Sequence, residues 1–301
     1  MNVSRSFLFV PGNHARRVEK ALSLDVDAVI LDLEDAVANS EKVATRALVL
    51  QALQRPHGPR GYVRVNALDT EFAFGDLQAV VHAGVDGIVL PKLETVEQLH
   101  TADWLITQLE SACGLTRGGI DLMPIIETGA GFANVEALTT AAAARMRTRV
   151  SRFAFGAGDF TLDMNLTWTT DELELLPYRS RLVLASRAAG IEPPIDTVWV
   201  RLDDPEGLAR SAQRGQGLGF QGKLCIHPTQ CPITNQTFAP AQPDVDRARA
   251  VIAAFEQAEA RGVASIQLDG EFIDYPIVFR ARRVLDLAGR IAARDRARTQ
   301  H

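Results

Sequence analysis

The chain has 301 residues, of which 47% are hydrophobic and 23% charged, and its 32 basic and 37 acidic residues give a net charge of −5 at pH 7. This composition excludes a disordered or fibrous chain, and the mild acidity gives no general attraction to nucleic acid or to an anionic membrane. Three cysteines without a paired spacing favour a reducing compartment, so we expect a cytoplasmic protein. Neither a membrane span nor a signal-peptide pattern is visible in the sequence.

Eight short β-rich runs recur along the chain, at residues 6–10, 28–33, 62–65, 87–90, 122–126, 153–155, 196–200 and 223–226. Helical patterns lie between them, at residues 15–24, 40–54, 77–83, 95–112, 132–144, 173–189 and 205–218. The strands are almost continuously apolar, which indicates burial on both faces, as in a parallel sheet covered by helices. Eight such units predict an α/β fold of the (β/α)8 TIM barrel type, with an open doubly wound sheet as the competing fold.

A C-terminal helical extension follows the last predicted strand. We predict a barrel domain at residues 1–232, which carries the functional site, and an extension at residues 233–301. The extension contains helical patterns at 244–261 and 275–293. We expect it to act as a lid or to contact a neighbouring subunit, and the alternative is that it covers the bottom of the barrel.

Polar residues follow most of the predicted strands, although the strands themselves are apolar. In a barrel of this kind, catalytic side chains come from the C-terminal ends of the strands. The residues at these ends are Asn13, Asp32, Glu34, Asp35, Arg64, Asn66, Lys92, Glu94, Glu127, Asp159 and His227. Charged groups closing apolar strands are costly to bury unless they are paired or bind a metal ion, so we expect a functional site at this end.

Glu127 and Asp159 are the predicted metal ligands, because they follow two consecutive strands. Two carboxylates, with room for water and substrate oxygens, suit Mg²⁺, with Mn²⁺ as the alternative ion. Gly129 and Gly158 flank the pair and would let a substrate approach closely. The competing interpretation is that each carboxylate caps the helix that follows it.

Arg64 is the candidate substrate-binding cation, because strand alternation points it and Asn66 to the same side. A guanidinium there could bind a carboxylate through two hydrogen bonds and stabilise an enolate. A structural salt bridge is the alternative role for Arg64.

Asp32, Glu34 and Asp35 form an acidic cluster after the second strand, and they could keep one carboxyl group basic near neutral pH. The alternatives are that these carboxylates are solvated at the rim of the barrel, or that they pair with Lys92 or Lys223.

Two further features have weaker patterns. The helix that follows Asn13 carries Arg16 and Lys20, which suit an anion, although no glycine-rich phosphate motif accompanies them. His227 is interpreted as a structural histidine rather than a catalytic one.

Taken together, these motifs resemble the citrate lyase β-subunit-like proteins of the HpcH/HpaI aldolase family, within the phosphoenolpyruvate/pyruvate barrel superfamily. The similar segments are RSFLFVPGN, AVILDLEDAV, YVRVNALDT, GIVLPKLE, MPIIETGAG, FAFGAGDF, GFQGKLCIHPTQ and DGEFIDYPIVFRAR, which together span residues 5–283. The resemblance implies a Mg²⁺-dependent carbon–carbon lyase that cleaves or forms a 3-hydroxy-acyl-CoA, such as citramalyl-, malyl- or citryl-CoA, to acetyl-CoA and a 2-keto acid. The alternatives are a CoA-independent aldolase acting on 4-hydroxy-2-keto acids, or a non-catalytic subunit of a larger lyase complex.

The same resemblance implies roles for individual residues. Glu127 and Asp159 match the Mg²⁺ ligands, Arg64 matches the arginine at the keto-acid end, and Glu34 and Asp35 match acidic groups near the metal.

Three further positions are also implied by the resemblance. Asp274 matches an aspartate that relatives lend to a neighbouring subunit, which implies a homo-oligomer, specifically a trimer. Arg16 and Lys20 would lie near the phosphates of CoA.

One departure from the family pattern concerns the segment around the second metal carboxylate. Gly158 stands where many relatives have an acidic residue, and the following residues 160–168 include the bulky Met164 and Trp168. We expect this segment to narrow the acyl pocket or to change its preference.

Overall fold

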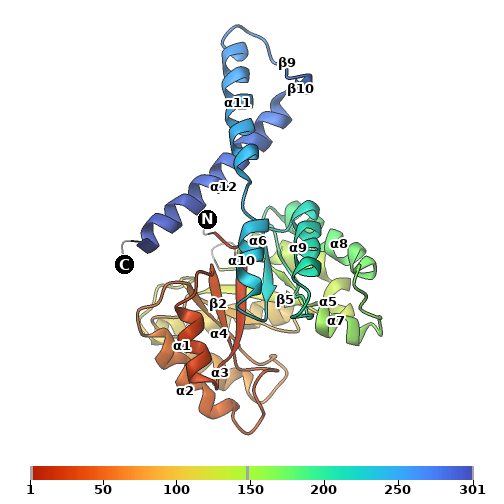
Figure 1. Cartoon of the computed structure of the whole chain (residues 1–301). Helices are drawn as coiled ribbons and strands as arrows, with labels where there is room; N and C mark the ends of the chain where they lie inside the picture. Colours follow the sequence, from red (N-terminus) through yellow and green to blue (C-terminus); the bar gives the residue numbers. More distant parts are fainter. Residues whose placement is uncertain (1–2, 147–148, 300–301) are drawn as a thin grey trace. The chain divides into compact units, whose positions relative to one another are not determined.

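The computed structural model describes residues 3–146 and 149–299 and contains a closed barrel of eight parallel strands (Figure 1). Each strand pairs with the next in sequence, and β8 pairs with β1 to close the barrel. The strands are β1 (Ser6–Pro11), β2 (Ala28–Asp32), β3 (Arg60–Arg64), β4 (Gly87–Leu90), β5 (Asp121–Ile126), β6 (Ala154–Phe155), β7 (Ile195–Asp196) and β8 (Gly222–Cys225). The predicted (β/α)8 barrel is confirmed, and the open sheet is excluded because the sheet closes.

Helices follow the strands and form the right-handed crossover connections between successive parallel strands. Within the barrel part they are α1 (Ala15–Leu22), α2 (Lys42–Leu53), α3 (Ala73–Val80), α4 (Val96–Ala112), α5 (Gly129–Ala133), α6 (Val135–Arg145), α7 (Ala157–Asp163), the 3₁₀ helix η1 (Leu173–Leu175), α8 (Leu176–Ala189), α9 (Pro205–Leu218) and α10 (Gln230–Thr237). The sequence pattern did not predict α7 and α10 as separate helices, because both are short and lack a clear apolar stripe.

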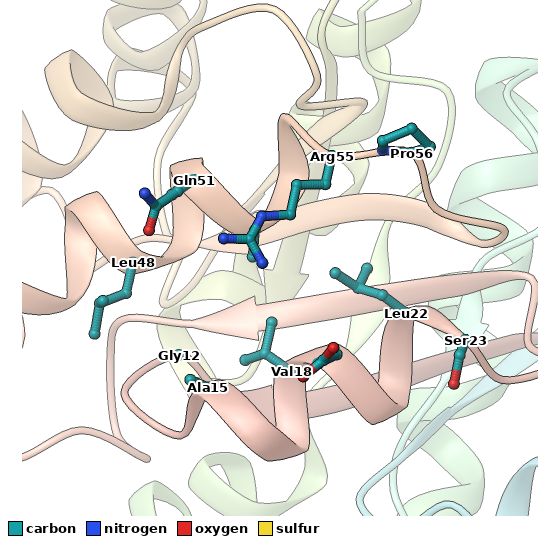
Figure 2. Close-up of a pocket in the computed structure, with 11 residues that line it drawn as sticks. Gly12, Ala15, Val18, Leu22, Ser23, Leu48, Gln51, Arg55 and Pro56 are labelled. Atoms are coloured by element: carbon teal, nitrogen blue, oxygen red, sulfur yellow. The ribbon is translucent and has the colours of Figure 1, made fainter.

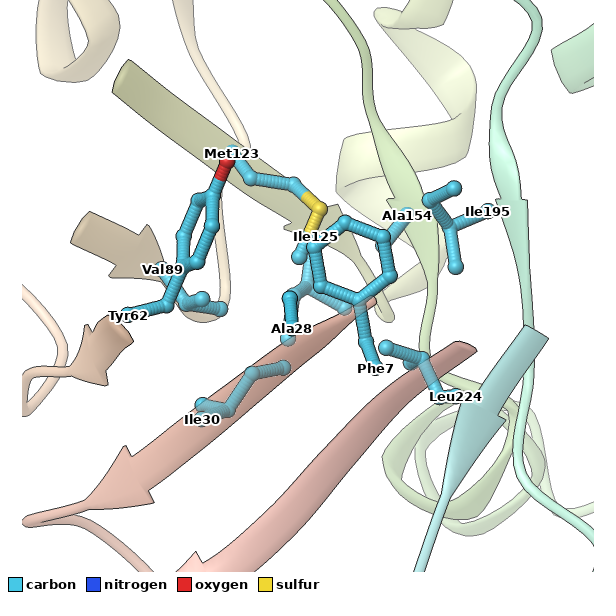
Figure 3. Packing of buried hydrophobic residues seen from close by; sticks show 10 residues of the cluster. All are labelled: Phe7, Ala28, Ile30, Tyr62, Val89, Met123, Ile125, Ala154, Ile195 and Leu224. Carbon is cyan, nitrogen blue, oxygen red and sulfur yellow. The ribbon is translucent and has the colours of Figure 1, made fainter. Parts of the chain in front are cut away.

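Buried side chains from all eight strands fill the barrel interior (Figure 3). Tyr62 of β3 and Ile125 of β5 both lie in this core. Since side chains alternate along a strand, Arg64, two positions after Tyr62 on β3, points toward the same axis at the carboxyl end, and Glu127 directly follows the last residue of β5. The core consists of Phe7, Ala28, Ile30, Tyr62, Val89, Met123, Ile125, Ala154, Ile195 and Leu224.

Strand β7 is shorter than the sequence predicts. The apolar run at 196–200 indicates a strand, but the ladder covers only Ile195–Asp196. The next residues bond to helices instead: the Thr197 hydroxyl accepts a hydrogen bond from the Ala157 N–H at 2.8 Å, and the Trp199 carbonyl accepts one from Gln230 at 2.8 Å. Tertiary hydrogen bonds therefore replace the expected strand pairing.

The chain divides into a barrel unit, residues 4–236, and a second unit that contains residues 237–299. The second unit consists of α11 (Gln242–Glu259), a hairpin of β9 (Ile266–Leu268) and β10 (Glu271–Ile273), and α12 (Tyr275–Thr299). It has its own apolar core, formed by Ala248, Val251, Phe255, Ile273, Val278 and Ala281. Among the helices of residues 3–146 and 149–299, none is long and apolar enough to cross a membrane.

A fully buried ion cluster joins β7, β8 and α8. The Arg179 guanidinium binds Asp196 at 2.8 Å and Glu172 at 3.0 Å, and Lys223 binds Asp196 at 2.9 Å. Burial would raise the pKa of Asp196, but the charges of Lys223 and Arg179 outweigh it and hold this pKa below its ordinary value. The cluster stabilises the region where the strand ladder is shortest.

We expect Arg179→Met to lower the free energy of unfolding by about 3 to 5 kcal/mol, because it leaves buried carboxylates without a main partner. Chemical denaturation measures this difference. The matched control is Arg181→Met on the same helix, whose pair with Glu136 is 40% and 56% exposed. The control should lose less than about 1 kcal/mol. Equal losses in the two variants would contradict the structural role of the cluster.

Candidate active site

Arg64 occupies the centre of a charged group at the carboxyl end of the barrel. Its Nε and Nη2 atoms donate to the two oxygens of Asp32, at 2.7 and 2.5 Å. Its Nη1 lies 3.1 Å from Glu34 and 3.9 Å from Asp35. The guanidinium also lies over the Phe9 ring, 4.8 Å from its centre. Arg64 thus has both proposed properties: it points to the barrel mouth, and it forms salt bridges there.

Glu127 follows β5 and is buried at the mouth. Its Oε1 accepts a hydrogen bond from the Lys92 N–H at 2.7 Å. Its Oε2 lies against Gly156, where a Cβ atom would collide with it. Burial, followed by the charge of Asp159, raises the pKa of Glu127 to about 8. Such a carboxyl group holds a proton at neutral pH until a cation replaces that proton.

Asp159 lies in the first turn of α7 and is half-buried. Its charge contributes to the raised pKa of Glu127 and also acts on Lys92, so the fold brings this predicted pair together. Among residues 3–146 and 149–299, no cluster of three or more His, Cys, Asp or Glu side chains is arranged to hold a metal ion.

The acidic cluster after β2 contacts two cations. The Lys92 ammonium lies 2.8 Å from Glu34 and 3.6 Å from Asp35. Burial raises the pKa of Glu34 above its ordinary value, although Arg64 and Lys92 oppose this effect. Of the two lysines considered from the sequence, Lys92 is the partner, whereas Lys223 belongs to the separate buried cluster.

Asn66 does not join Arg64, contrary to the alternation argument. Strand β3 ends at Arg64, and the chain turns before residue 66. Asn66 instead accepts a hydrogen bond from Lys42 of α2 at 2.7 Å and donates to Asp76 of α3 at 2.6 Å. Alternation fails here because it applies only while the strand continues.

The segment that departs from the family pattern lies against the loop after Glu127. The Asp163 carboxylate accepts a hydrogen bond from the Gly129 N–H at 2.7 Å. The sulfur of Met164 lies 2.8 Å from the place where a Cβ of Gly129 would be. Gly158, in contrast, is exposed, with no atom within 4 Å of its Cβ position. Met164 therefore limits the space over Gly129, whereas the space at Gly158 is open.

Two pockets adjoin helix α1. The first, about 440 Å³, lies beside β1 and is lined by Arg17, Lys20 and His227 among others. His227 is exposed and hydrogen-bonds to the Thr229 hydroxyl at 2.8 Å, and its structural role stays a prediction. Arg16 is exposed on α1 and does not line this pocket. The predicted anion-binding helix thus presents two cations to a pocket, one of which, Arg17, the sequence analysis did not select.

The second pocket, about 340 Å³, lies between α1 and α2 (Figure 2). Apolar side chains such as Val18, Leu22 and Leu48 line it, together with Gln51 and Arg55. It contains none of the predicted site residues.

Asp274 belongs to the second unit and is half-buried directly before α12. Its carboxylate accepts a hydrogen bond from the Ile277 N–H at 3.4 Å, as a helix-capping residue does. Asp274 therefore occupies a capping position at the start of α12, and its role in catalysis stays a prediction.

The family model described as HpcH/HpaI aldolase/citrate lyase matches residues 5–228. The chain belongs to this family. It is 40% identical to the citrate lyase subunit beta of Leuconostoc mesenteroides subsp. cremoris, over 94% of this chain and 93% of that protein. It is 34% identical to the (3S)-malyl-CoA thioesterase of Cereibacter sphaeroides, over 96% of both chains.

A solved structure is also similar over almost the whole chain. It is the protein CitE from Mycobacterium tuberculosis in complex with magnesium, acetoacetate and coenzyme A, with a TM-score of 0.75 and 27% identity. The match covers 95% of this chain and 98% of that one. The resemblance recognised in the sequence is confirmed, and the chain is a carbon–carbon lyase of the citrate lyase β-subunit type.

Lys92 is the site residue that the sequence analysis did not assign. It contacts Glu127 through its backbone and Glu34 through its ammonium. In the sequence, Lys92 follows Pro91 after the apolar run at 87–90 and is a candidate partner of the acidic cluster, but a charge near a strand end does not reveal the backbone contact with Glu127.

We expect the stability of the metal-free protein to depend on the ionisation of Glu127. Because the pKa is raised from 4.5 to about 8, the stability contributed by this group is present below pH 4.5 and is lost as the pH rises through 8. Glu127→Gln cannot ionise, so relative to wild type it should gain about 2 to 5 kcal/mol between pH 5 and pH 9.

Urea unfolding in the presence of a chelator measures this gain. The exposed Glu97→Gln on α4 is the control and should show no comparable change with pH. A constant difference between Glu127→Gln and wild type at both pH values would show that Glu127 is not held in a site unfavourable to its charge.

Proposed function

We propose that this chain is a Mg²⁺-dependent lyase that cleaves or forms a 3-hydroxy-acyl-CoA, such as citramalyl-, malyl- or citryl-CoA, to acetyl-CoA and a 2-keto acid. The observation that carries the proposal is that the buried Glu127 and the half-buried Asp159 and Arg64 converge at the carboxyl end of one barrel. The relatives named citrate lyase subunit beta and (3S)-malyl-CoA thioesterase support the class of substrate.

The residues present fit a magnesium ion. The donor set is two carboxylates, which is the number Mg²⁺ commonly takes from a protein. The Glu127 carboxyl group is protonated at neutral pH in the absence of a cation, and Gly156 leaves room for its Oε2. When bound, Mg²⁺ would act as a Lewis acid that offsets negative charge developing on the substrate oxygens. Mn²⁺ prefers the same oxygen donors and is the alternative ion.

Arg64 is suited to hold the 2-keto acid end of the substrate. Two of its five N–H groups bind Asp32, and these bonds fix the plane of the guanidinium. The Nη1 group, which lies 3.1 Å from Glu34, and the second N–H of Nη2 could also donate to a substrate carboxylate or an enolate oxygen. Gly158 leaves open space for close approach, whereas Met164 limits the space at Gly129. Because the site is largely buried, a donor placed in advance stabilises developing charge more than water does.

The CoA moiety fits the pocket beside β1. Arg17 and Lys20 line this pocket, and their charges suit the phosphates of CoA. Arg16 lies on the exposed side of the same helix, where it adds to the positive potential. This arrangement favours a CoA thioester over a free hydroxy-keto acid.

In the cleavage direction, the substrate hydroxyl loses one proton and the enolate carbon gains one. Glu34 and Asp35 are the candidate bases for the hydroxyl proton. The Glu34 Oε2 is buried and lies 3.1 Å from the Arg64 Nη1, but it accepts no hydrogen bond among the described residues. The carbon–carbon bond then breaks, its electron pair moves to the carbon beside the thioester, and the hydroxyl-bearing carbon becomes the ketone. Asp274 of a neighbouring chain donates the proton that converts the enolate to acetyl-CoA. The assembly is a homotrimer in this proposal.

The same proposal includes a cytoplasmic location. Cys113, Cys225 and Cys231 are all free thiols, and Cys113 is exposed. Free thiols are typical of a reducing compartment.

Purified protein, Mg²⁺, acetyl-CoA and a panel of 2-keto acids should give a 3-hydroxy-acyl-CoA that mass spectrometry identifies. We expect Glu127→Gln and Asp159→Asn each to lower the rate at least about 100-fold, because each removes a ligand of the metal. Calorimetry should show a matching loss of Mg²⁺ affinity. The control Asp103→Asn on α4, far from these ligands in the sequence, should keep both properties.

The same assay separates the alternatives. Cleavage of 4-hydroxy-2-keto acids without CoA would support a CoA-independent aldolase, and release of free CoA would indicate thioester hydrolysis. Turnover by neither class of substrate would favour a subunit that needs a larger complex. Wild-type rates and affinity in both carboxylate variants would overturn the metal assignment.

Asp274→Asn should be inactive alone, as should Glu127→Gln, but co-refolded mixtures should regain activity. If one chain supplies Glu127 and its neighbour supplies Asp274, about a quarter of the sites in a random symmetric mixture combine both intact residues. Activity measurements on mixtures, with each variant alone as the control, test this. Mixtures as inactive as the single variants would show that Asp274 does not act across chains.

A further inference from the structure

Lys92 has a backbone conformation that is rare for its residue type. Its φ angle is +50°, in the left-handed region, directly after β4. A side chain with a Cβ is strained in this conformation, because the Cβ comes close to the neighbouring carbonyl oxygen. Such a conformation persists only where the surrounding contacts require it, so its contacts indicate what the residue does.

In this conformation, Lys92 contacts one acidic residue through its backbone N–H and another through its side-chain ammonium. The Lys92 N–H donates to Glu127 Oε1 at 2.7 Å. The side chain extends to Glu34 Oε1 at 2.8 Å, with Asp35 at 3.6 Å. Lys92 therefore connects the candidate metal ligand with the acidic cluster after β2.

The exposure of the Lys92 side chain distinguishes it from a structural lysine. Its side chain is 35% exposed, whereas that of Lys223, in the buried ion cluster, is 0% exposed. The ammonium thus borders open space at the mouth, while its partner Glu34 is 5% exposed. A group in this place can hold Glu34 and still respond to a molecule that enters the site.

We propose that Lys92 is a positioning residue of the lyase site, whose backbone N–H orients Glu127 and whose ammonium holds Glu34 beside Arg64. The inference rests on the proposed function and adds two separable tasks to it. The N–H occupies Oε1 of Glu127 and leaves Oε2 for the cation. The ammonium fixes the orientation of Glu34, which otherwise depends on Arg64 alone.

Lys92→Gly separates these tasks, because glycine keeps the N–H and accepts a positive φ but removes the ammonium. We expect Mg²⁺ affinity, measured by calorimetry, to stay within about threefold of wild type. The kcat should fall about 10- to 100-fold, the effect of losing one hydrogen bond between charged groups. Added methylammonium should restore part of the lost rate in this variant and leave wild type unchanged.

Two further variants serve as a second test and as a control. Lys92→Asn also tolerates a positive φ and should behave like Lys92→Gly, which keeps the test valid should the glycine variant fold poorly. Asp269→Gly relieves the same type of strain at an exposed residue of the second unit, with φ +50°, and should keep wild-type kcat.

The outcomes are distinct. A Lys92→Gly variant with wild-type kcat would overturn the role of the ammonium, and loss of Mg²⁺ affinity in that variant, which keeps the N–H, would contradict the separation of the two tasks. A rate loss that methylammonium cannot restore would also contradict the inference. Wild-type protein that neither binds Mg²⁺ nor turns over a thioester would instead refute the proposed function itself.

Discussion

The ion pair between Arg64 and Asp32 is the interaction on which the arrangement of the site depends. It joins the ends of β2 and β3 through two hydrogen bonds and thereby fixes the guanidinium at the mouth of the barrel. Glu34 and Asp35 then gather around the same cation. Since two parallel bonds fix a plane as well as a distance, the pair determines which direction the remaining N–H groups face.

The barrel contains two kinds of charged cluster. The buried cluster of Arg179, Lys223, Asp196 and Glu172 pairs two cations with two carboxylates, and the two cations lower the pKa of Asp196. At the barrel mouth, in contrast, the pKa values of Glu127 and Glu34 are raised, because burial and neighbouring carboxylates outweigh the cations. An excess of negative charge in a buried site is unfavourable for the free protein and favourable for a cation, which distinguishes a binding site from a structural one.

The barrel provides this site with a rigid support. Parallel strands end at the same face, so side chains more than 30 residues apart in the sequence meet without any local motif. The register of β2 with β3 pairs Asp32 directly with Arg64, and Glu127 directly follows the last residue of β5. The segment after Asp159 then adds a specific feature, since Asp163 and Met164 lie against Gly129 and shape one side of the mouth.

The sequence alone determined the barrel, since its eight apolar runs need cover on both faces, and also determined which polar residues end the strands. Motif resemblance added the family. Only the tertiary structure decided the partners: Asn66 turns away to Lys42 and Asp76, His227 lies exposed beside a pocket, and Lys92 reaches Glu127 and Glu34. The physical reason is that hydrophobic periodicity reports which face of an element is buried, whereas ion pairs and turns beyond strand ends depend on contacts between distant segments.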